Sequence, residues 1–171
     1  MRKFTLLFAF LLSLIGVTQA QTVITDLGSL SNDKVYILSA GDKGTLQVND
    51  DATAIVRAAE LTKAENQQFA ILKSIAGTYH LYSVSAQKFV SRLELKPFTG
   101  SSDFLASAVT LVPHAPNGEA SGKFVIKSGD DLYNINGENN LVVNGWNTHD
   151  AGNGFQIEEV GDLGELSADL R

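Results

Sequence analysis

The chain of 171 residues contains no cysteine, only three prolines and a single tryptophan, Trp146. The lack of cysteine excludes disulfides, thiol catalysis, thiolate zinc sites and iron–sulfur clusters, so stability must come from packing and strand pairing. Basic residues are also scarce, because 13 Lys and Arg stand against 19 Asp and Glu. No basic cluster stands out, which disfavours nucleic acid or an anionic membrane surface as a partner.

Only one long apolar run occurs, and it lies at the N-terminus. Arg2 and Lys3 precede an apolar stretch over 4–15, and Thr18 and Ala20 follow it. This order is typical of a secretory signal peptide, and twelve residues are too few to span a bilayer as a helix. The alternative, a membrane anchor, is disfavoured by that length. We therefore predict cleavage after Ala20.

The predicted mature chain has 151 residues and a formal charge of −8. That length suits one domain with a real core. No second apolar run of spanning length follows, so we expect no membrane insertion. Without cysteine the protein is not a lipoprotein, and we expect it in the periplasm, secreted, or associated with the cell surface.

Two phrases recur along the mature chain. The first is Phe-x-Ile after polar or Gly residues, and the second is a strand, a polar turn and another strand, with a Tyr ten residues before an apolar residue. Alternation puts the apolar residues on one strand face, and the polar turns suit hairpins. We expect one core built from Phe69, Phe124, Phe155, Ile71, Ile126, Ile157, Leu46, Phe89 and Val143.

Three copies of about four short strands predict an all-β domain that is closed and pseudo-threefold, with three unequal repeats. A β-sandwich with accidental similarity is the alternative. We assign 53–58 and 109–114 to third strands, and 124–126 to the end of the second repeat. We interpret the long insertion after Arg92 as an excursion loop and 58–68 as a loop turn.

The phrase "DAGNGFQIEEV" at 150–160 resembles the ending D-x-G-N-x-F-x-I-E-E-V of exported bacterial β-trefoil modules. The resemblance covers about residues 32–160, between a lead-in at 21–31 and an acidic tail at 161–171. It implies the β-trefoil fold of ricin-type lectin domains and a glycan or polysaccharide partner. The Gln-x-Trp element of those lectins corresponds to Phe-x-Ile here, with Gln67 and Asn153 at the Gln position and Gly122 departing from it.

The inherited sugar site departs from the ricin-type pattern. Those lectins use an Asp near the start of the second hairpin strand, and the corresponding positions hold Gln47, Val90 and Asn144. We therefore do not expect a lectin-like site in the first two repeats. The third repeat keeps the most suitable residue types.

The third repeat supplies the candidate ligand-binding set. Amide and carboxylate groups can bind sugar hydroxyls, and a Trp face covers the C–H face of a sugar ring. The alternative is that Trp146 closes one end of the barrel and that the polar residues only cap turns. The candidate residues are Asn144, Trp146, Asn147, Asp150 and Asn153.

The sequence contains no pattern that predicts a metal site or a catalytic site. An EF-hand loop counted from Asp150 fails because Gly152 and Gly154 fall on ligand positions, although a looser calcium site stays an alternative. The three histidines, His80, His114 and His149, lack metal-ligand spacing. We predict no metal, no cofactor and no enzymatic activity.

The sequence therefore predicts an exported, non-catalytic binding module with weak carbohydrate binding through its third repeat. Two alternatives stay open. A trefoil-type protease inhibitor would use the segment 92–104, with Arg92 or Lys96 as the inserted side chain. A protein-interaction or envelope module would instead bind a protein partner.

Overall fold

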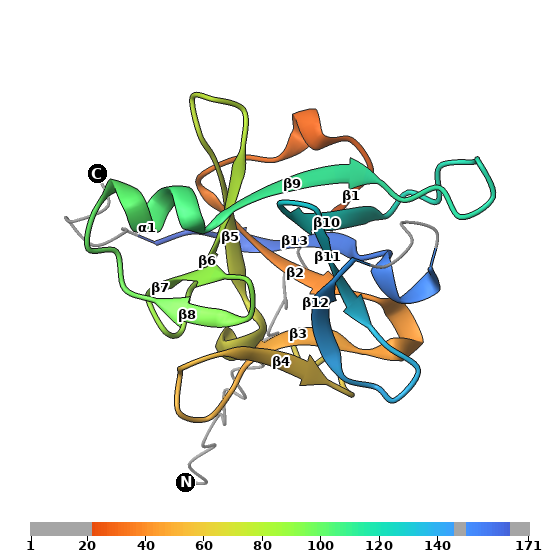
Figure 1. The fold of residues 1–171 in the computed structure, drawn as a ribbon, viewed down its shortest axis with the longest axis horizontal. Helices are drawn as coiled ribbons and strands as arrows, with labels where there is room; N and C mark the ends of the chain where they lie inside the picture. The colour runs from red at the N-terminus through yellow and green to blue at the C-terminus, as the bar shows by residue number, and fades with distance from the viewer. Residues whose placement is uncertain (1–21, 146–149, 165–171) are drawn as a thin grey trace, which may run out of the picture.

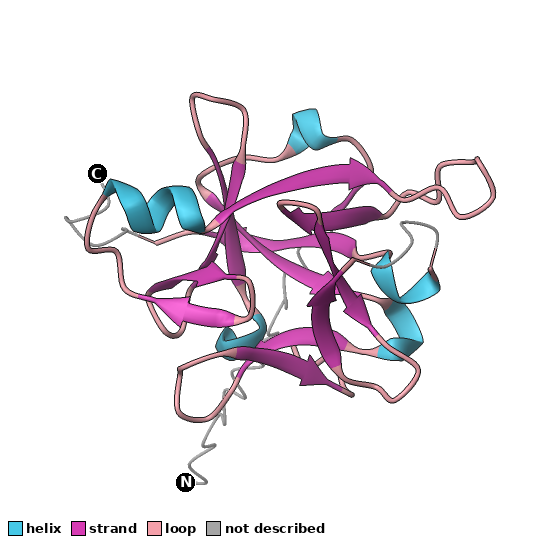
Figure 2. Cartoon of the chain, in the orientation of Figure 1, coloured by secondary structure: helices cyan, strands magenta, loops and turns pink. Residues whose placement is uncertain are grey.

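The computed structural model describes residues 22–145 and 150–164. Its elements are short strands that pair antiparallel throughout, with one α-helix and four 3₁₀ turns among them (Figure 2). The strands are β1 (Thr22–Ile24), β2 (Lys34–Ser39), β3 (Thr45–Val48), β4 (Ile55–Ala58), β5 (Phe69–Lys73), β6 (Tyr79–Ser83), β7 (Lys88–Ser91), β8 (Glu94–Lys96), β9 (Ala108–Pro113), β10 (Phe124–Ser128), β11 (Asp131–Ile135), β12 (Leu141–Asn144) and β13 (Gln156–Asp162). The helical elements are η1 (Leu27–Ser29), η2 (Gly41–Lys43), η3 (Glu65–Gln67), α1 (Ser101–Ala106) and η4 (Ala151–Asn153).

Six strands close into a barrel. They pair in the order β13, β2, β5, β6, β9, β10, and a bridge between Phe124 and Phe155 joins the last strand to the first. The hairpins β3–β4, β7–β8 and β11–β12 extend from this barrel (Figure 1). A barrel of six strands with three hairpins is a β-trefoil, so the predicted fold is confirmed.

The threefold relation appears in the strand register. Where the first strand of each repeat meets the fourth, Tyr36 pairs with Phe69, Tyr79 with Val109, and Phe124 with Phe155. The repeats are therefore β2–β5, β6–β9 and β10–β13, and each has four strands.

This register corrects the repeat boundaries expected from the sequence. The Phe124 strand begins the third repeat instead of ending the second, and 109–114 is the fourth strand of the second repeat, not a third. The third repeat keeps all four strands. The prediction was wrong because Val109 stands where the other repeats have Phe, while Phe124 stands where they have Tyr.

The long insertion after Arg92 is not an unstructured excursion loop. It contains β8, which completes the second hairpin, and α1, which precedes β9. The segment 58–68 ends in the 3₁₀ turn η3. A short helical element thus leads into the fourth strand of each repeat, and these elements are η3, α1 and η4.

The core lies inside the barrel and contains seven of the nine expected residues. Val143 is partly buried against it, whereas Phe89 lies in a separate cluster with Ala70 and Tyr82. Because Phe89 pairs with Tyr82, its neighbour Val90 points inward and is fully buried. Phe89 packs instead against Phe104 of α1, edge to face at 5.8 Å.

The first and last described strands, β1 and β13, lie side by side. β13 pairs with β2 on one edge and with β1 on the other. Within the described ranges, no helix has the length and hydropathy needed to cross a membrane.

Candidate functional site

The candidate loop of the third repeat joins β12 to η4. Trp146, Asn147 and His149 lie outside the described residues. Asn144 ends β12 opposite Leu132, and its Oδ1 is buried with no hydrogen-bond partner among residues 22–145 and 150–164. A buried carbonyl oxygen without a donor is costly, and none of the described residues supplies a donor to this atom.

Asp150 begins the other side of the loop. Its side chain is exposed, and Oδ1 accepts a hydrogen bond from the main-chain N–H of Gly152 at 2.7 Å, which caps η4. The main-chain oxygen of Asp150 lies 3.1 Å from Nε2 of the buried His114, and Nδ1 of the same ring lies 3.0 Å from Ser121 Oγ. These contacts hold the carboxylate at a fixed place.

Two glycines bring this side of the loop close to its neighbours. A Cβ on Gly152 would lie 2.3 Å from the main-chain oxygen of Ile135, and one on Gly154 would lie 2.6 Å from Nδ1 of His114. Neither position has room for a side chain. The sequence therefore uses glycine where η4 packs on β11 and on the end of β9.

Asn153 does not face the loop opening, because it is fully buried. Its Oδ1 accepts a hydrogen bond from Nδ2 of Asn134 on β11. The equivalent residue in the first repeat, Gln67, donates from Nε2 to Oε1 of Gln47 at 3.0 Å. In this arrangement Asn153 supports the base of the loop.

The structure thus brings Asn144 and Asp150 to the two ends of one loop and places Asn153 behind it. The first two offer an amide and a carboxylate, which suit donors such as sugar hydroxyls.

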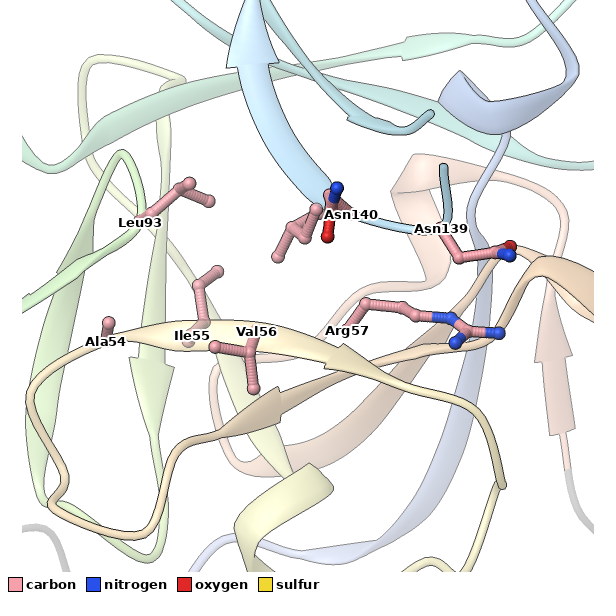
Figure 3. A pocket seen from close by; sticks show the side chains of 8 residues that line it. Ala54, Ile55, Val56, Arg57, Leu93, Asn139 and Asn140 are labelled. Carbon is pink, nitrogen blue, oxygen red and sulfur yellow. The ribbon is translucent and has the colours of Figure 1, made fainter. Parts of the chain in front are cut away.

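A second feature, which the sequence did not predict, is a cavity of about 350 Å³ beside β4. Figure 3 shows Arg57 and Asn139 toward one end of this cavity and Ile55 and Leu93 toward the other. Arg57 pairs with Leu46, and the equivalent positions of the other hairpins hold Leu95 and Val143. The sequence did contain a sign of this site, because the first repeat has a charged residue where the other two repeats have an apolar one. With the repeat boundaries expected from the sequence, these three positions were not aligned with one another.

The segment proposed for protease inhibition is tied down at both candidate side chains. Arg92 pairs with Asp131 at 2.7 Å, and its Nη2 donates to the main-chain oxygen of Val143 at 3.1 Å. Lys96 pairs with Glu94 on the same strand. Neither residue lies on a free extended loop, which an inhibitor needs in order to enter a protease cleft.

The described histidines pack within the fold. His80 is buried with its ring stacked on Phe104 at 3.6 Å, and burial lowers its pKa. No group of three or more His, Asp or Glu side chains in the described part of the chain is placed to hold a metal ion.

Comparisons with solved structures find β-trefoil proteins. The chain is similar to SeviL bound to asialo-GM1 saccharide (17% identity, TM-score 0.55, 74% of this chain and 97% of that one). It is also similar to ThreeFoil, a designed threefold-symmetric protein (14% identity, TM-score 0.59, 74% and 99%). A third similar structure is a GlcNAcα1-4Gal-releasing endo-β-galactosidase from Clostridium perfringens (9% identity, TM-score 0.61, 74% of this chain).

This chain spans about a third (32%) of the galactosidase's length. At these identities the likeness concerns the fold. No protein-family model matches the sequence, and no curated protein matches it either.

Proposed function

We propose that the protein is a non-catalytic carbohydrate-binding module that uses the loop of its third repeat. The observation that carries the proposal is the buried Oδ1 of Asn144, which has no hydrogen-bond partner among the described residues, at one end of this loop, together with the anchored carboxylate of Asp150 at the other end. The shared fold with a saccharide-bound protein supports the choice of ligand class.

In this proposal each residue has one role. Trp146 stacks on the sugar ring, while Asn144, Asn147 and Asp150 bind its hydroxyls. Asn153 holds the loop through its bond to Asn134. A single small site gives weak binding, with Kd on the order of tens of micromolar to millimolar.

A glycan-array screen followed by fluorescence titration tests the proposal. Because Trp146 is the only tryptophan, its emission reports on this loop alone. We expect the emission to change on binding, and we expect Trp146→Ala to abolish binding while the protein stays folded. An emission that is already blue-shifted, insensitive to an aqueous quencher and unchanged by every glycan on the array would show that Trp146 is structural.

Asp150→Asn is the sharper variant, because the amide oxygen can still cap η4 while the charge is lost. We expect it to weaken glycan binding by about 1–3 kcal/mol. Asp130→Asn is the matched control, since Asp130 is exposed in the turn between β10 and β11. Equal affinities for the two variants would count against a role for Asp150.

Export forms a separate part of the proposal. The basic, apolar and small residues of positions 1–20 support cleavage after Ala20. N-terminal sequencing of the protein from its own host should therefore begin at or near Gln21. Recovery of the chain with Met1 intact from a membrane fraction would refute this.

A further inference from the structure

The three hairpins of the trefoil meet along three seams, and these seams differ. Between the first and second hairpins, Ile55 N–H donates to Leu93 O and Leu95 N–H donates to Thr53 O, both at 2.7 Å. This seam is closed by main-chain hydrogen bonds.

Arg92 bridges the second and third hairpins, beside a cavity of about 300 Å³ that is lined by Ser91, Arg92, Leu93, Glu94 and Val143. Its main-chain oxygen accepts from the Tyr133 hydroxyl, and its guanidinium contacts Val143 O and Asp131. The cavity of about 350 Å³ lies at the seam between the third and first hairpins, between β4 and the segment 139–141. Two of the three junctions therefore hold a cavity, and the arginine differs between them: Arg92 is paired with Asp131, whereas Arg57 has no such partner among the described residues.

The seam between the third and first hairpins exposes a strand edge. β4 pairs with β3 alone as a strand. Because the N–H of Ile55 points away from β3 toward Leu93, strand alternation directs the main-chain N–H and C=O of Arg57 to the same side. That side borders the cavity. The second hairpin bonds to this edge only as far as Ile55, so the main chain of Arg57 offers a hydrogen-bonding edge to a ligand in the cavity.

The Arg57 side chain is held in place but not neutralised. Its Nε donates to Lys43 O at 2.7 Å, and a Cβ on Gly44 would lie 2.8 Å from that nitrogen. No carboxylate of the described residues lies within 4.0 Å of this guanidinium, in contrast to Arg92. Figure 3 shows the guanidinium below Asn139.

The opposite wall is a rigid turn. Oδ1 of Asn136 accepts from the N–H of Glu138 at 3.0 Å and of Asn140 at 2.9 Å. Asn139 lies in the left-handed region with φ of 62°. The amides of Asn139 and Asn140 therefore stand on a backbone that is ordered before any ligand arrives.

The other lining residues are aliphatic. Ile55, Leu93 and Leu141 come from the three hairpins, and no aromatic side chain of the described residues lines the cavity. Sugar sites gain much from a flat aromatic face, which this cavity does not offer. Aliphatic walls instead suit a branched aliphatic side chain.

We propose that this cleft binds the C-terminal end of an extended peptide from a protein partner, with an aliphatic last residue. The carboxylate pairs with the Arg57 guanidinium, the main chain adds to the free edge of β4, and the aliphatic side chain packs on the partly exposed Leu93, beside the buried Ile55 and Leu141. The amides of Asn139 and Asn140 bind the remaining peptide groups. This site is separate from the loop of the third repeat and does not depend on glycan binding there.

The test uses two pools of acetylated tetrapeptides that end in Leu, Ile or Val, one with free carboxylates and one amidated. Binding to the purified protein is followed by NMR, through the Arg57 Nε–H signal and the side-chain amides of Asn139 and Asn140. We expect these signals to shift with the free acids, with Kd on the order of 0.1–1 mM, and at least about tenfold weaker binding of the amides.

Three variants sharpen the test. Arg57→Met keeps most of the length of the side chain but removes the charge, and it should lower the affinity for the free acids at least about tenfold. Arg57→Lys keeps the charge but loses the two parallel N–H donors of the guanidinium, so its affinity should lie between those of the parent protein and Arg57→Met. Asn139→Gly keeps the left-handed turn and removes one amide. Lys73→Met is the control for net charge, because Lys73 lies at the β5–β6 turn, at the other end of the molecule from β4 (Figure 1).

Equal binding of acids and amides, unchanged affinity of Arg57→Met, or no shift with either pool would overturn the proposal. Methyl glucuronoside and methyl glucoside form a second arm. Shifts of the Arg57 signal with the glucuronoside alone would show that the cleft takes an acidic sugar and would also overturn it. Loss of glycan binding in Trp146→Ala leaves all these outcomes unaffected.

Discussion

Asn134 and Asn153 join side chain to side chain inside the third repeat, where Nδ2 of Asn134 donates to Oδ1 of Asn153 and both residues are buried. The same two positions of the first repeat hold Gln47 and Gln67, which are also bonded. In the second repeat they hold Ser91, which donates to Ala106 O, and the buried Ser107. Each repeat thus has a polar residue at the end of the helical element that leads into its fourth strand, or directly after that element, and a side chain of the second strand bonds to this end of the helical element.

Replacing Asn153 by Ala should lower the free energy of unfolding by about 1–3 kcal/mol, because the buried amide of Asn134 loses a partner. Urea denaturation measures the change. Asn140→Ala is the control, since this exposed amide should change stability by less than about 0.5 kcal/mol. A double-mutant cycle with Asn134→Ala isolates the pair, and a coupling energy near zero would contradict the anchoring role.

The corrected repeat boundaries also make a prediction. Leu111 occupies the place of Ile71 and Ile157, so Leu111→Ala should cost about 2–5 kcal/mol and Phe155→Ala about 3–5 kcal/mol. All these side chains are at most 4% exposed. Thermal or urea unfolding tests this, and a cost for Leu111→Ala typical of a surface position would restore the earlier repeat boundaries.

Gly152→Ala should destabilise the protein by about 1–3 kcal/mol, because the new methyl group meets the main-chain oxygen of Ile135 and the strand must shift. Gly137→Ala is the matched control: a Cβ there meets nothing within 4 Å. Equal unfolding midpoints for the two variants would show that η4 moves away from β11 at little cost.

The pH dependence of stability should contain a contribution from His80. Its Nδ1 contacts Ser107 Oγ at 3.0 Å, while Nε2 is buried without a partner in the described part of the chain, and burial lowers its pKa below the ordinary 6.5. The unfolded chain therefore binds more protons near that pH, so stability should be full above pH 6.5 and fall as the pH drops below it.

His80→Gln isolates this contribution. Urea midpoints at pH 7.5, 6.5 and 5.5 should show a smaller fall for the variant than for the parent protein. Parallel pH profiles would mean that His80 is as easily protonated in the folded protein as in the unfolded one.

The fold was predictable because alternation and hairpin turns are local signals that three repeats present three times. Phe69 and Phe155 were identified correctly since an inward-facing strand position tolerates few residue types. The repeat boundaries were not predicted correctly. Val109 stands where the other repeats have Phe, and Phe124 stands where they have Tyr, so the Phe-x-Ile pattern at Phe124 was assigned to the wrong strand. The pairings of Tyr79 with Val109 and of Phe124 with Phe155 resolve this, and pairing partners far apart in the chain leave no mark in composition.

The site was predictable in part. Caps and glycine turns near Asp150 follow from local chemistry, but the burial of Asn153 depends on Asn134, a residue on another strand. The cavity beside Arg57 could not be predicted from local sequence, because it forms between segments from all three repeats. The sequence of each of these segments taken alone predicts only a hairpin and gives no sign of a cavity.

The double pairing of β13 bears on when the chain can fold. The ion pair between Lys34 and Asp162 spans 128 residues, so β2 has no partner on that edge until the last strand has been made. A chain that emerges N-terminus first must keep this edge unpaired until β13 has been made, and such distant contacts form slowly. The barrel therefore closes only after the synthesis of β13, and a chain that stops before Phe155 lacks the residue that closes it.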